Sequence, residues 1–141
     1  MTPVPGNRVV VSPNLAEPVG YAHAVVAGPG RTVYLGGQAA QGPDGAIRGA
    51  TVVDQFDQAA ANLCEALRAA GGAPADLVSL QVFVTDPAAY RASLPDLGRV
   101  WRRWFGRHYP AMGLFGVTAL FDPAALVELM GVAVVAAPQG G

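Results

Sequence analysis

Lysine is absent from this sequence of 141 residues, and all nine basic residues are arginines. The absence excludes chemistry that needs a lysine amine, such as Schiff-base catalysis, pyridoxal-phosphate attachment or a phosphate-loop lysine. Charge of either sign is scarce, since 13% of the residues are charged, against about 25% in an average protein. So few charges predict either an unusually neutral surface or a surface partly buried against other subunits, and we favour the second.

Cysteine and long apolar runs are scarce as well. Cys64 is the single cysteine, which excludes an intramolecular disulfide and a cysteine-rich metal site. Residues 1–5 lack the basic and apolar regions of a signal peptide, and no uncharged apolar run approaches the roughly 20 residues that span a bilayer. The formal charge of −1 argues against an electrostatic nucleic-acid binder. We therefore expect a cytoplasmic protein without membrane or nucleic-acid partners.

What is present is a set of periodic apolar segments, separated by glycine and proline. Short β-branched or alternating runs predict strands at residues 8–12, 21–27, 32–36, 77–84, 112–120 and 126–135. The second and third of these are expected to form a hairpin around Gly28-Pro29-Gly30. Helical spacing predicts a helix from the N-cap Thr51 to Gly71-Gly72, and a second helix over 87–105 that begins at Pro87 or only at Pro95.

Two amphipathic helices can cover one face of a sheet, so the predicted fold is a two-layer α+β domain with a mixed sheet. The other face then remains apolar and needs a partner, in agreement with the low charge. We expect residues 1–14 to be an N-terminal extension with an edge strand. Residues 15–135 then form the domain, and residues 136–141 form a disordered tail.

Six segments carry motifs in a distinctive order and spacing. They are residues 18–25 (PVGYAHAV), 35–38 (LGGQ), 58–72, 82–86 (VFVTD), 105–111 (FGRHYPA) and 125–133 (ALVELMGVA). Together they resemble the motifs of the RidA (YjgF-type) reactive-intermediate deaminases. The resemblance covers roughly residues 15–135 and is strong because several separated motifs agree.

The resemblance implies a chorismate-mutase-like subunit that assembles into a homotrimer. The sheets of that family form an inner barrel, and three pockets lie in the clefts between subunits. Its members hydrolyse enamines and imines of the 2-aminoacrylate type to 2-keto acids and ammonia, without metal or cofactor. An arginine after Pro-Ala holds the substrate carboxylate, a tyrosine lies nearby, and a glutamate on the last strand positions the attacking water.

This sequence departs from the family pattern where that carboxylate and that water are held. Met112 replaces the arginine and Met130 replaces the glutamate, while Gly36 and Gly98 replace a serine and an asparagine. A thioether cannot supply the two charge-assisted hydrogen bonds of a guanidinium. Burying a carboxylate against it costs on the order of several kcal/mol, or about a thousandfold in affinity. We therefore expect 2-aminoacrylate and 2-iminopropionate to be poor substrates.

The polar residues that remain define the predicted catalytic groups. Tyr21 matches the family tyrosine and is predicted to donate a proton to an imine nitrogen, a carbonyl or an enolate. Backbone amides near Gly37 are predicted to stabilise an oxyanion. We expect Glu128 or His23 to act as a base or to orient a water. The alternative is that Glu128 forms a structural ion pair and that His23 is an ordinary surface or interface histidine. The predicted substrate-binding residues are Met112, Leu114, Met130, Gln38, Phe115, Trp101 and His23.

Three functions remain open. The first is a divergent RidA-like enzyme that uses no cofactor or metal. It would act on an uncharged or bulky, largely apolar intermediate, as in secondary metabolism, by imine or enamine hydrolysis, tautomerisation or cyclisation. The second is a non-catalytic module that binds a small metabolite or a protein in the same clefts. The third and weakest is RNA binding by Arg99, Arg103 and Arg107, because arginines at this spacing beside Trp101 and Trp104 more often form a solvated helix face.

Overall fold

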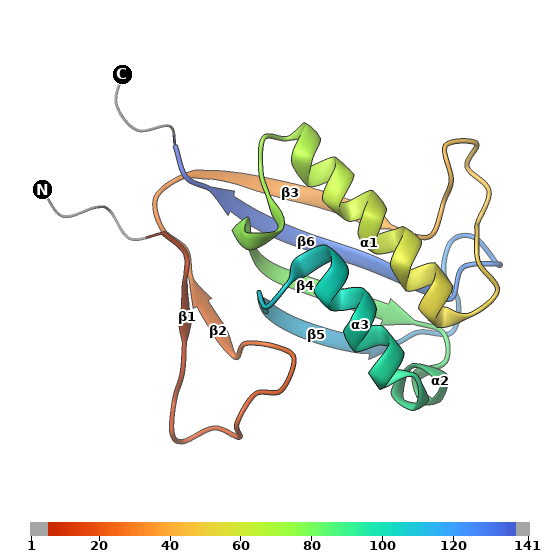
Figure 1. Ribbon diagram of the computed structural model, residues 1–141, viewed down its shortest axis with the longest axis horizontal. Helices are drawn as coiled ribbons and strands as arrows, with labels where there is room; N and C mark the ends of the chain where they lie inside the picture. Colours follow the sequence, from red (N-terminus) through yellow and green to blue (C-terminus); the bar gives the residue numbers. More distant parts are fainter. Residues whose placement is uncertain (1–5, 138–141) are drawn as a thin grey trace, which may run out of the picture.

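The computed structural model describes residues 6–137. The strands are β1 (Arg8–Val10), β2 (Ala24–Val26), β3 (Arg31–Gln38), β4 (Leu77–Val84), β5 (Ala111–Gly116) and β6 (Val127–Val135). The α-helices are α1 (Val52–Ala69), α2 (Pro87–Ala92) and α3 (Leu94–Phe105), and a 3-10 turn, η1, covers Pro74–Asp76. The helices lie over one face of the larger sheet, which confirms the predicted two-layer α+β fold (Figure 1).

The larger sheet has the strand order β3-β6-β4-β5. Strands β4 and β5 run parallel, whereas β6 is antiparallel to both β3 and β4, so the sheet is mixed as predicted. Alternate residues of the central strands face the helices, among them Leu80, Val82 and Leu129, which are fully buried. They pack against the apolar face of α1, including Phe56, and of α3, including Trp101.

The helix ends follow the local signals in the sequence. The hydroxyl of Thr51 accepts a hydrogen bond from the amide of Asp54 at 3.1 Å, which caps α1. Gly71, at φ +89°, ends that helix in the left-handed region. The second predicted helix is two helices: α2 begins at the expected Pro87 and ends at Ala92, and α3 begins at Leu94, one residue before the alternative start at Pro95. The Ser93 hydroxyl donates to the Ala89 carbonyl at 2.8 Å and closes α2.

The predicted hairpin of residues 21–27 and 32–36 is wrong. Strand β2 pairs with β1 in a separate antiparallel sheet, and β3 pairs with β6. Gly28-Pro29-Gly30 therefore carries the chain from one sheet to the other, and the Asn7 side chain holds it there by accepting from the Gly28 amide at 3.0 Å. Turn residues indicate that the chain changes direction, but they do not determine which strand becomes the partner.

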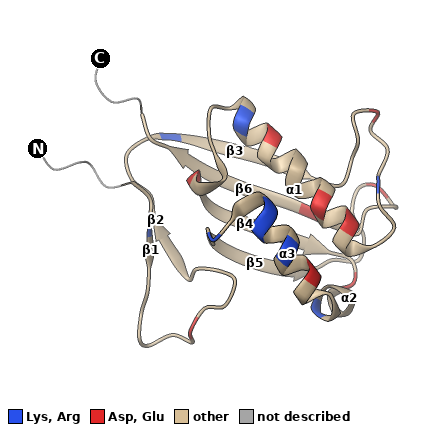
Figure 2. Cartoon of the chain, viewed as in Figure 1, with Lys and Arg blue, Asp and Glu red and all other residues tan. Residues whose placement is uncertain are grey.

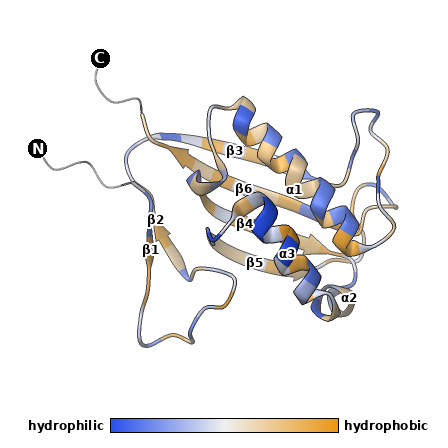
Figure 3. Ribbon diagram, in the orientation of Figure 1, coloured by the Kyte–Doolittle hydropathy of each residue, from blue (hydrophilic) through white to orange (hydrophobic). Residues whose placement is uncertain are grey.

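The face of the sheet opposite the helices is largely apolar, apart from polar residues such as Gln81 and Glu128, and it is uncovered in the single chain. Tyr34, Phe115 and Met130 are exposed there. The charged residues lie mostly on the helices and loops (Figure 2), and the strands are largely apolar (Figure 3). The expectation of an apolar open face is therefore met. Of the predicted disordered tail, residues 138–141 lie outside the described part of the chain.

Candidate functional site

Tyr21 is positioned by the segment that precedes β2, which lies beside the start of the edge strand β5. The amide of Ala22 donates to the carbonyl of Pro110 at 3.0 Å, and Ala22 forms an isolated parallel bridge with Ala111. The ring of Tyr21 packs edge-on against the imidazole of His23, with 5.2 Å between ring centroids. Nε2 of His23 lies 2.7 Å from the Ala16 carbonyl oxygen, so this histidine hydrogen-bonds within its own loop.

A cavity lies between this segment, α2, α3 and β5. It has two parts that share lining residues: one of about 300 Å³ beside Trp101, which we call the inner part, and one of about 380 Å³ beside Tyr21, which we call the outer part. Both volumes are within the range of small-molecule sites. Both parts are lined by Val19, Gly20, Tyr90, Leu94 and Met112. The outer part adds Tyr21, Val82, Gly113 and Leu114. The inner part adds Phe56, Leu97, Gly98, Trp101 and Tyr109.

The lining of this cavity, within the described residues, contains no charged side chain. Its side-chain polar groups are the hydroxyls of Tyr21, Tyr90 and Tyr109 and the indole N–H of Trp101. That indole N–H donates to the carbonyl of His108 at 3.2 Å. Burial raises the pKa of Tyr90 to about 12, so its hydroxyl keeps its proton at neutral pH. The cavity therefore offers neutral hydrogen-bonding groups and no cationic partner for a carboxylate.

A second group of predicted residues lies on the opposite face of the sheet. Glu128 and Met130 alternate on β6 with the buried Val127 and Leu129, and they therefore point away from the helices. The carboxylate of Glu128 lies against Gly37, where a Cβ would be 2.7 Å from Oε2. Glycine at this position makes that approach possible, and it brings two of the predicted catalytic residues together.

Phe115 also belongs to this second group, whereas the predicted substrate-binding residue Gln38 does not, because the irregular pairing of β3 places it opposite Leu129 on the helix side of the sheet. Gln38 ends β3 beyond an irregular step in its pairing with β6, and its amide nitrogen lies 3.5 Å from the Gly36 carbonyl oxygen. Phe115 stacks on Phe83, with ring centroids 5.7 Å apart. The sheet thus divides the predicted site in one chain: Tyr21, Met112, Leu114 and Trp101 line the cavity. On the other face lie Gly37, Phe115, Glu128 and Met130, whereas Gln38 lies on the α1 side, in a hollow that Gln58 and Asn62 also line.

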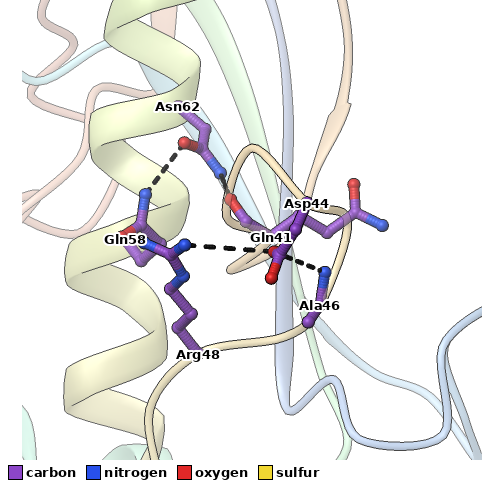
Figure 4. Close-up of polar contacts among 6 residues, drawn as sticks. All are labelled: Gln41, Asp44, Ala46, Arg48, Gln58 and Asn62. Atoms are coloured by element: carbon purple, nitrogen blue, oxygen red, sulfur yellow. Dashed lines mark hydrogen bonds and ion pairs between the residues drawn. The ribbon is translucent and has the colours of Figure 1, made fainter.

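The loop after β3 is tied to α1 by side-chain amides (Figure 4). Asn62 donates to the carbonyls of Ala39 at 3.0 Å and Gln41 at 2.8 Å, and it accepts from Gln58 at 3.0 Å. At the loop tip, Asp44 accepts from the amide of Ala46 at 3.1 Å. Because Ala39 directly follows Gln38, these bonds fix the end of β3 beside Gly37.

Several lining residues were not predicted from the sequence, chiefly Tyr90, Tyr109, Phe56 and Leu94. Tyr90 carried one usable signal, because it is the single aromatic residue of the short helix that follows the N-cap Asp86. In the structure its ring packs against Phe56 of α1. The other three approach the cavity from elements whose packing the sequence pattern does not specify.

The arginines of α3 lie on its exposed side. This is the solvated helix face that we expected as the alternative to RNA binding. Arg99 pairs with Asp96, and Arg103 pairs with Asp57 at 2.8 Å. Trp101 is buried against Phe105, with 4.2 Å between ring centroids. Within residues 6–137, no group of three histidine, cysteine, aspartate or glutamate side chains is arranged to hold a metal ion. No helix in that range has the length and apolar character needed to cross a membrane.

The fold and the cavity define a small two-layer α+β protein with a ligand-sized cavity beside its mixed sheet. The sequence model of the family described as endoribonuclease L-PSP matches residues 13–135. The chain belongs to this family, which is the YjgF/RidA family. None of the curated proteins searched matches the chain.

Solved structures of Rid proteins have the same fold. YyfB of Yersinia pestis, from the Rid protein family, is 32% identical with a TM-score of 0.83, over 92% of this chain and 99% of that one. Rv2704 of Mycobacterium tuberculosis, from the YjgF/YER057c/UK114 family, is 32% identical with a TM-score of 0.62, over 83% and 88%. RidA of an Antarctic Psychrobacter is 28% identical with a TM-score of 0.65, over 85% and 92%.

Proposed function

We propose that this protein is a divergent RidA-like enzyme that works without a cofactor on an uncharged or bulky, largely apolar intermediate. Family membership supports a role in processing small molecules. The observation that carries the finer proposal is the lining of the cavity. Met112, which the resemblance aligns with the family arginine, lines both parts of the cavity, and no charged residue accompanies it among the described lining residues.

This lining argues against the common substrates of the family. A carboxylate in the cavity would lose its water without gaining a cationic partner, which costs on the order of several kcal/mol. A neutral imine, enamine or carbonyl compound loses far less on entering, and the apolar walls favour its burial. An efficient reaction with 2-aminoacrylate or 2-iminopropionate is therefore not part of the proposed function.

Tyr21 is the proposed proton donor because its ring lies at the outer part of the cavity, beside Met112 and Leu114. Proton donation to an imine nitrogen would prepare the carbon for attack by water, and donation to a carbonyl or an enolate would serve tautomerisation or cyclisation. In the hydrolysis, water adds to the C=N bond, ammonia leaves and a ketone remains.

A homotrimer is the proposed active form, with each cavity completed by the open sheet face of a neighbouring subunit. The exposed apolar residues of the open sheet face, including Tyr34, Phe115 and Met130, support such an interface. Glu128 and Gly37 lie together on that face. In the assembled cleft, the carboxylate would orient the water and the backbone at Gly37 would stabilise the developing charge. Met130 and His23 would complete the walls.

The test compares two imines on the wild-type protein and on Tyr21→Phe. For the neutral imine of acetophenone, we expect the wild type to accelerate ketone release and Tyr21→Phe to lose about a hundredfold or more of that rate, as is typical of a general acid. For freshly generated 2-iminopropionate, we expect pyruvate release near the rate in buffer. Rapid pyruvate release would contradict the proposal, and equal ketone release by both proteins would favour the non-catalytic binding module.

A further inference from the structure

Gly98 leaves space at the inner part of the cavity that no backbone requirement explains. It lies inside α3 without a positive φ, and a Cβ at this position would meet nothing closer than Nη1 of Arg102 at 3.7 Å. Glycine is the least favourable residue inside a helix after proline, because it gives up the most backbone freedom. Since Gly98 lines the cavity, its effect there is to widen the space over Leu94 and Trp101.

Tyr90 is the one tyrosine that lines both parts of the cavity. Its ring packs against Phe56, with 6.3 Å between centroids and 54° between planes, which fixes its orientation. Its hydroxyl takes part in none of the hydrogen bonds of the described residues, and no buried side-chain oxygen or nitrogen among them lacks a partner, so this hydroxyl is accessible rather than buried. Its raised pKa keeps the proton on that hydroxyl. The side chain is therefore a fixed donor that a ligand in the cavity can use.

The inner walls are flat aromatic rings. Trp101 and Tyr109 are nearly parallel, with 5° between their planes and 5.8 Å between centroids. Phe56 lies 6.5 Å from Trp101 at 46°. Rings arranged in this way favour a further ring that stacks or packs edge-on, more than they favour a branched aliphatic group.

We propose that the cavity recognises a neutral planar molecule, namely an aromatic or conjugated ring that carries an oxygen acceptor. The Tyr90 hydroxyl donates to that acceptor, and Gly98 sets the size of the ring that fits. This inference rests on the proposed function and names the substrate class for the same cavity.

The first arm of the experiment tests Tyr90 with two isosteric probes, acetophenone and α-methylstyrene, of which only acetophenone has an acceptor. Binding is followed by the methyl signal of Met112 in protein with isotope-labelled methionine, which contains three methionines. In Tyr90→Phe, we expect the preference for acetophenone over α-methylstyrene to fall about fivefold, the effect of one neutral hydrogen bond. The control Tyr34→Phe lies on the opposite sheet face, where the preference stays unchanged.

The second arm tests Gly98 with acetophenone and the larger 2-acetylnaphthalene. In Gly98→Leu, we expect binding of 2-acetylnaphthalene to weaken about tenfold or more, while binding of acetophenone changes less than about threefold. Gly98→Ala serves as the folding control, because alanine fits the helix and raises its stability. Its melting temperature should be at or above that of the wild type.

The outcomes separate this inference from the proposed function. Saturable binding of acetophenone at Met112, with the same probe preference in Tyr90→Phe and the same size preference in Gly98→Leu, would overturn the inference and leave the proposed function standing. A loss of preference in Tyr109→Phe in place of Tyr90→Phe would also overturn it. Wild-type protein that binds benzoate more tightly than acetophenone would overturn both.

Discussion

At the scale of single residues, our proposal assigns to the side chain of Met112 the choice of the ligand charge that the cavity accepts. It reaches both parts of the cavity, and the surrounding groups are apolar or tyrosine side chains. Replacing it by arginine would add a cation with two parallel donors at the point where a carboxylate is otherwise unpartnered.

We predict that Met112→Arg strengthens the binding of benzoate on the order of tenfold or more and weakens the binding of acetophenone. The gain comes from charge-assisted hydrogen bonds, and the loss comes from the apolar space that the guanidinium occupies. Calorimetric titration of both ligands measures the change. Met112→Leu is the control that keeps the size and adds no charge, and its affinity for benzoate should stay near the wild-type value. An unchanged affinity for benzoate in Met112→Arg would contradict this account of the cavity.

Cys64 illustrates how burial alone sets the reactivity of a residue. It is half-buried on α1, with its sulfur 3.9 Å from the Trp104 carbonyl oxygen, and burial raises the pKa of its thiol to about 11. The reactive thiolate is therefore a very small fraction of the thiol near neutral pH.

We predict that iodoacetamide alkylates native Cys64 on the order of a hundredfold more slowly than free cysteine at about pH 8. The rate should increase as the pH rises toward 11, because the thiolate forms above the pKa. Mass spectrometry of timed samples measures it, with urea-unfolded protein as the control that reacts like free cysteine. Rapid alkylation of the folded protein at pH 8 would show that the Cys64 thiol is not buried and that its pKa is not raised.

At the scale of elements, the contact between α1 and the loop after β3 determines where the end of β3 lies. The Asn62 amide satisfies two carbonyls of that loop, those of Ala39 and Gln41. Removing it leaves the half-buried Ala39 carbonyl without a donor.

We predict that Asn62→Ala lowers the free energy of unfolding by about 1–3 kcal/mol and speeds hydrogen exchange in residues 39–48. Gln58→Ala is the matched control, since it removes only the bond that Gln58 donates to Asn62. It should cost less and leave the loop protected. Urea denaturation and amide exchange measure the two effects. Equal losses in the two variants would show that the loop is not held by Asn62.

Local signals predicted the elements well where one residue decides the outcome. The Thr51 cap, the stop at Gly71 and the alternation in β4 and β6 are present as expected. Strand pairing was harder to predict, because β1 and β2 join segments on either side of a long loop, and β3 pairs with the last strand of the chain. Such partners depend on the packing of the whole sheet, and no turn motif specifies them.

The candidate site could be predicted only in part, because it also depends on how the strands and helices pack together. The resemblance to the RidA family placed Tyr21 and Met112, and strand alternation correctly grouped Met112 with Leu114 and Glu128 with Met130. The alternation of each strand is local, but the face that each set occupies depends on register with β4. Tyr90 and Gly98 join the cavity through helix packing, which the sequence pattern leaves open.

At the scale of the whole molecule, the few charged residues are unevenly distributed, and the open sheet face has fewer of them than the helix side. The ion pairs of the described residues are formed within and between the helices or in the loop after β3. The open sheet face carries exposed apolar side chains, including Tyr34 and Met130. A face of this kind favours association with copies of the same chain.

We predict that light scattering gives a mass near three times 14.4 kDa, and that Met130→Asp shifts the protein toward the monomer by placing a charge in the interface. Phe121→Asp is the control, because Phe121 is fully exposed in the loop between β5 and β6 and is not part of the open sheet face. It should leave the mass unchanged. A monomer of 14.4 kDa for the wild type in dilute solution would contradict the trimer and the cleft between subunits.

The central claim is that the cavity at Met112 takes a neutral ligand where the family takes a carboxylate. Titrating the wild-type protein with acetophenone and with benzoate, two rings of similar size, tests it most directly through the methyl signal of Met112. The account predicts saturable shifts with acetophenone and at least about tenfold weaker binding of benzoate, the cost of burying an unpaired carboxylate. Binding of benzoate that equals or exceeds that of acetophenone would contradict it.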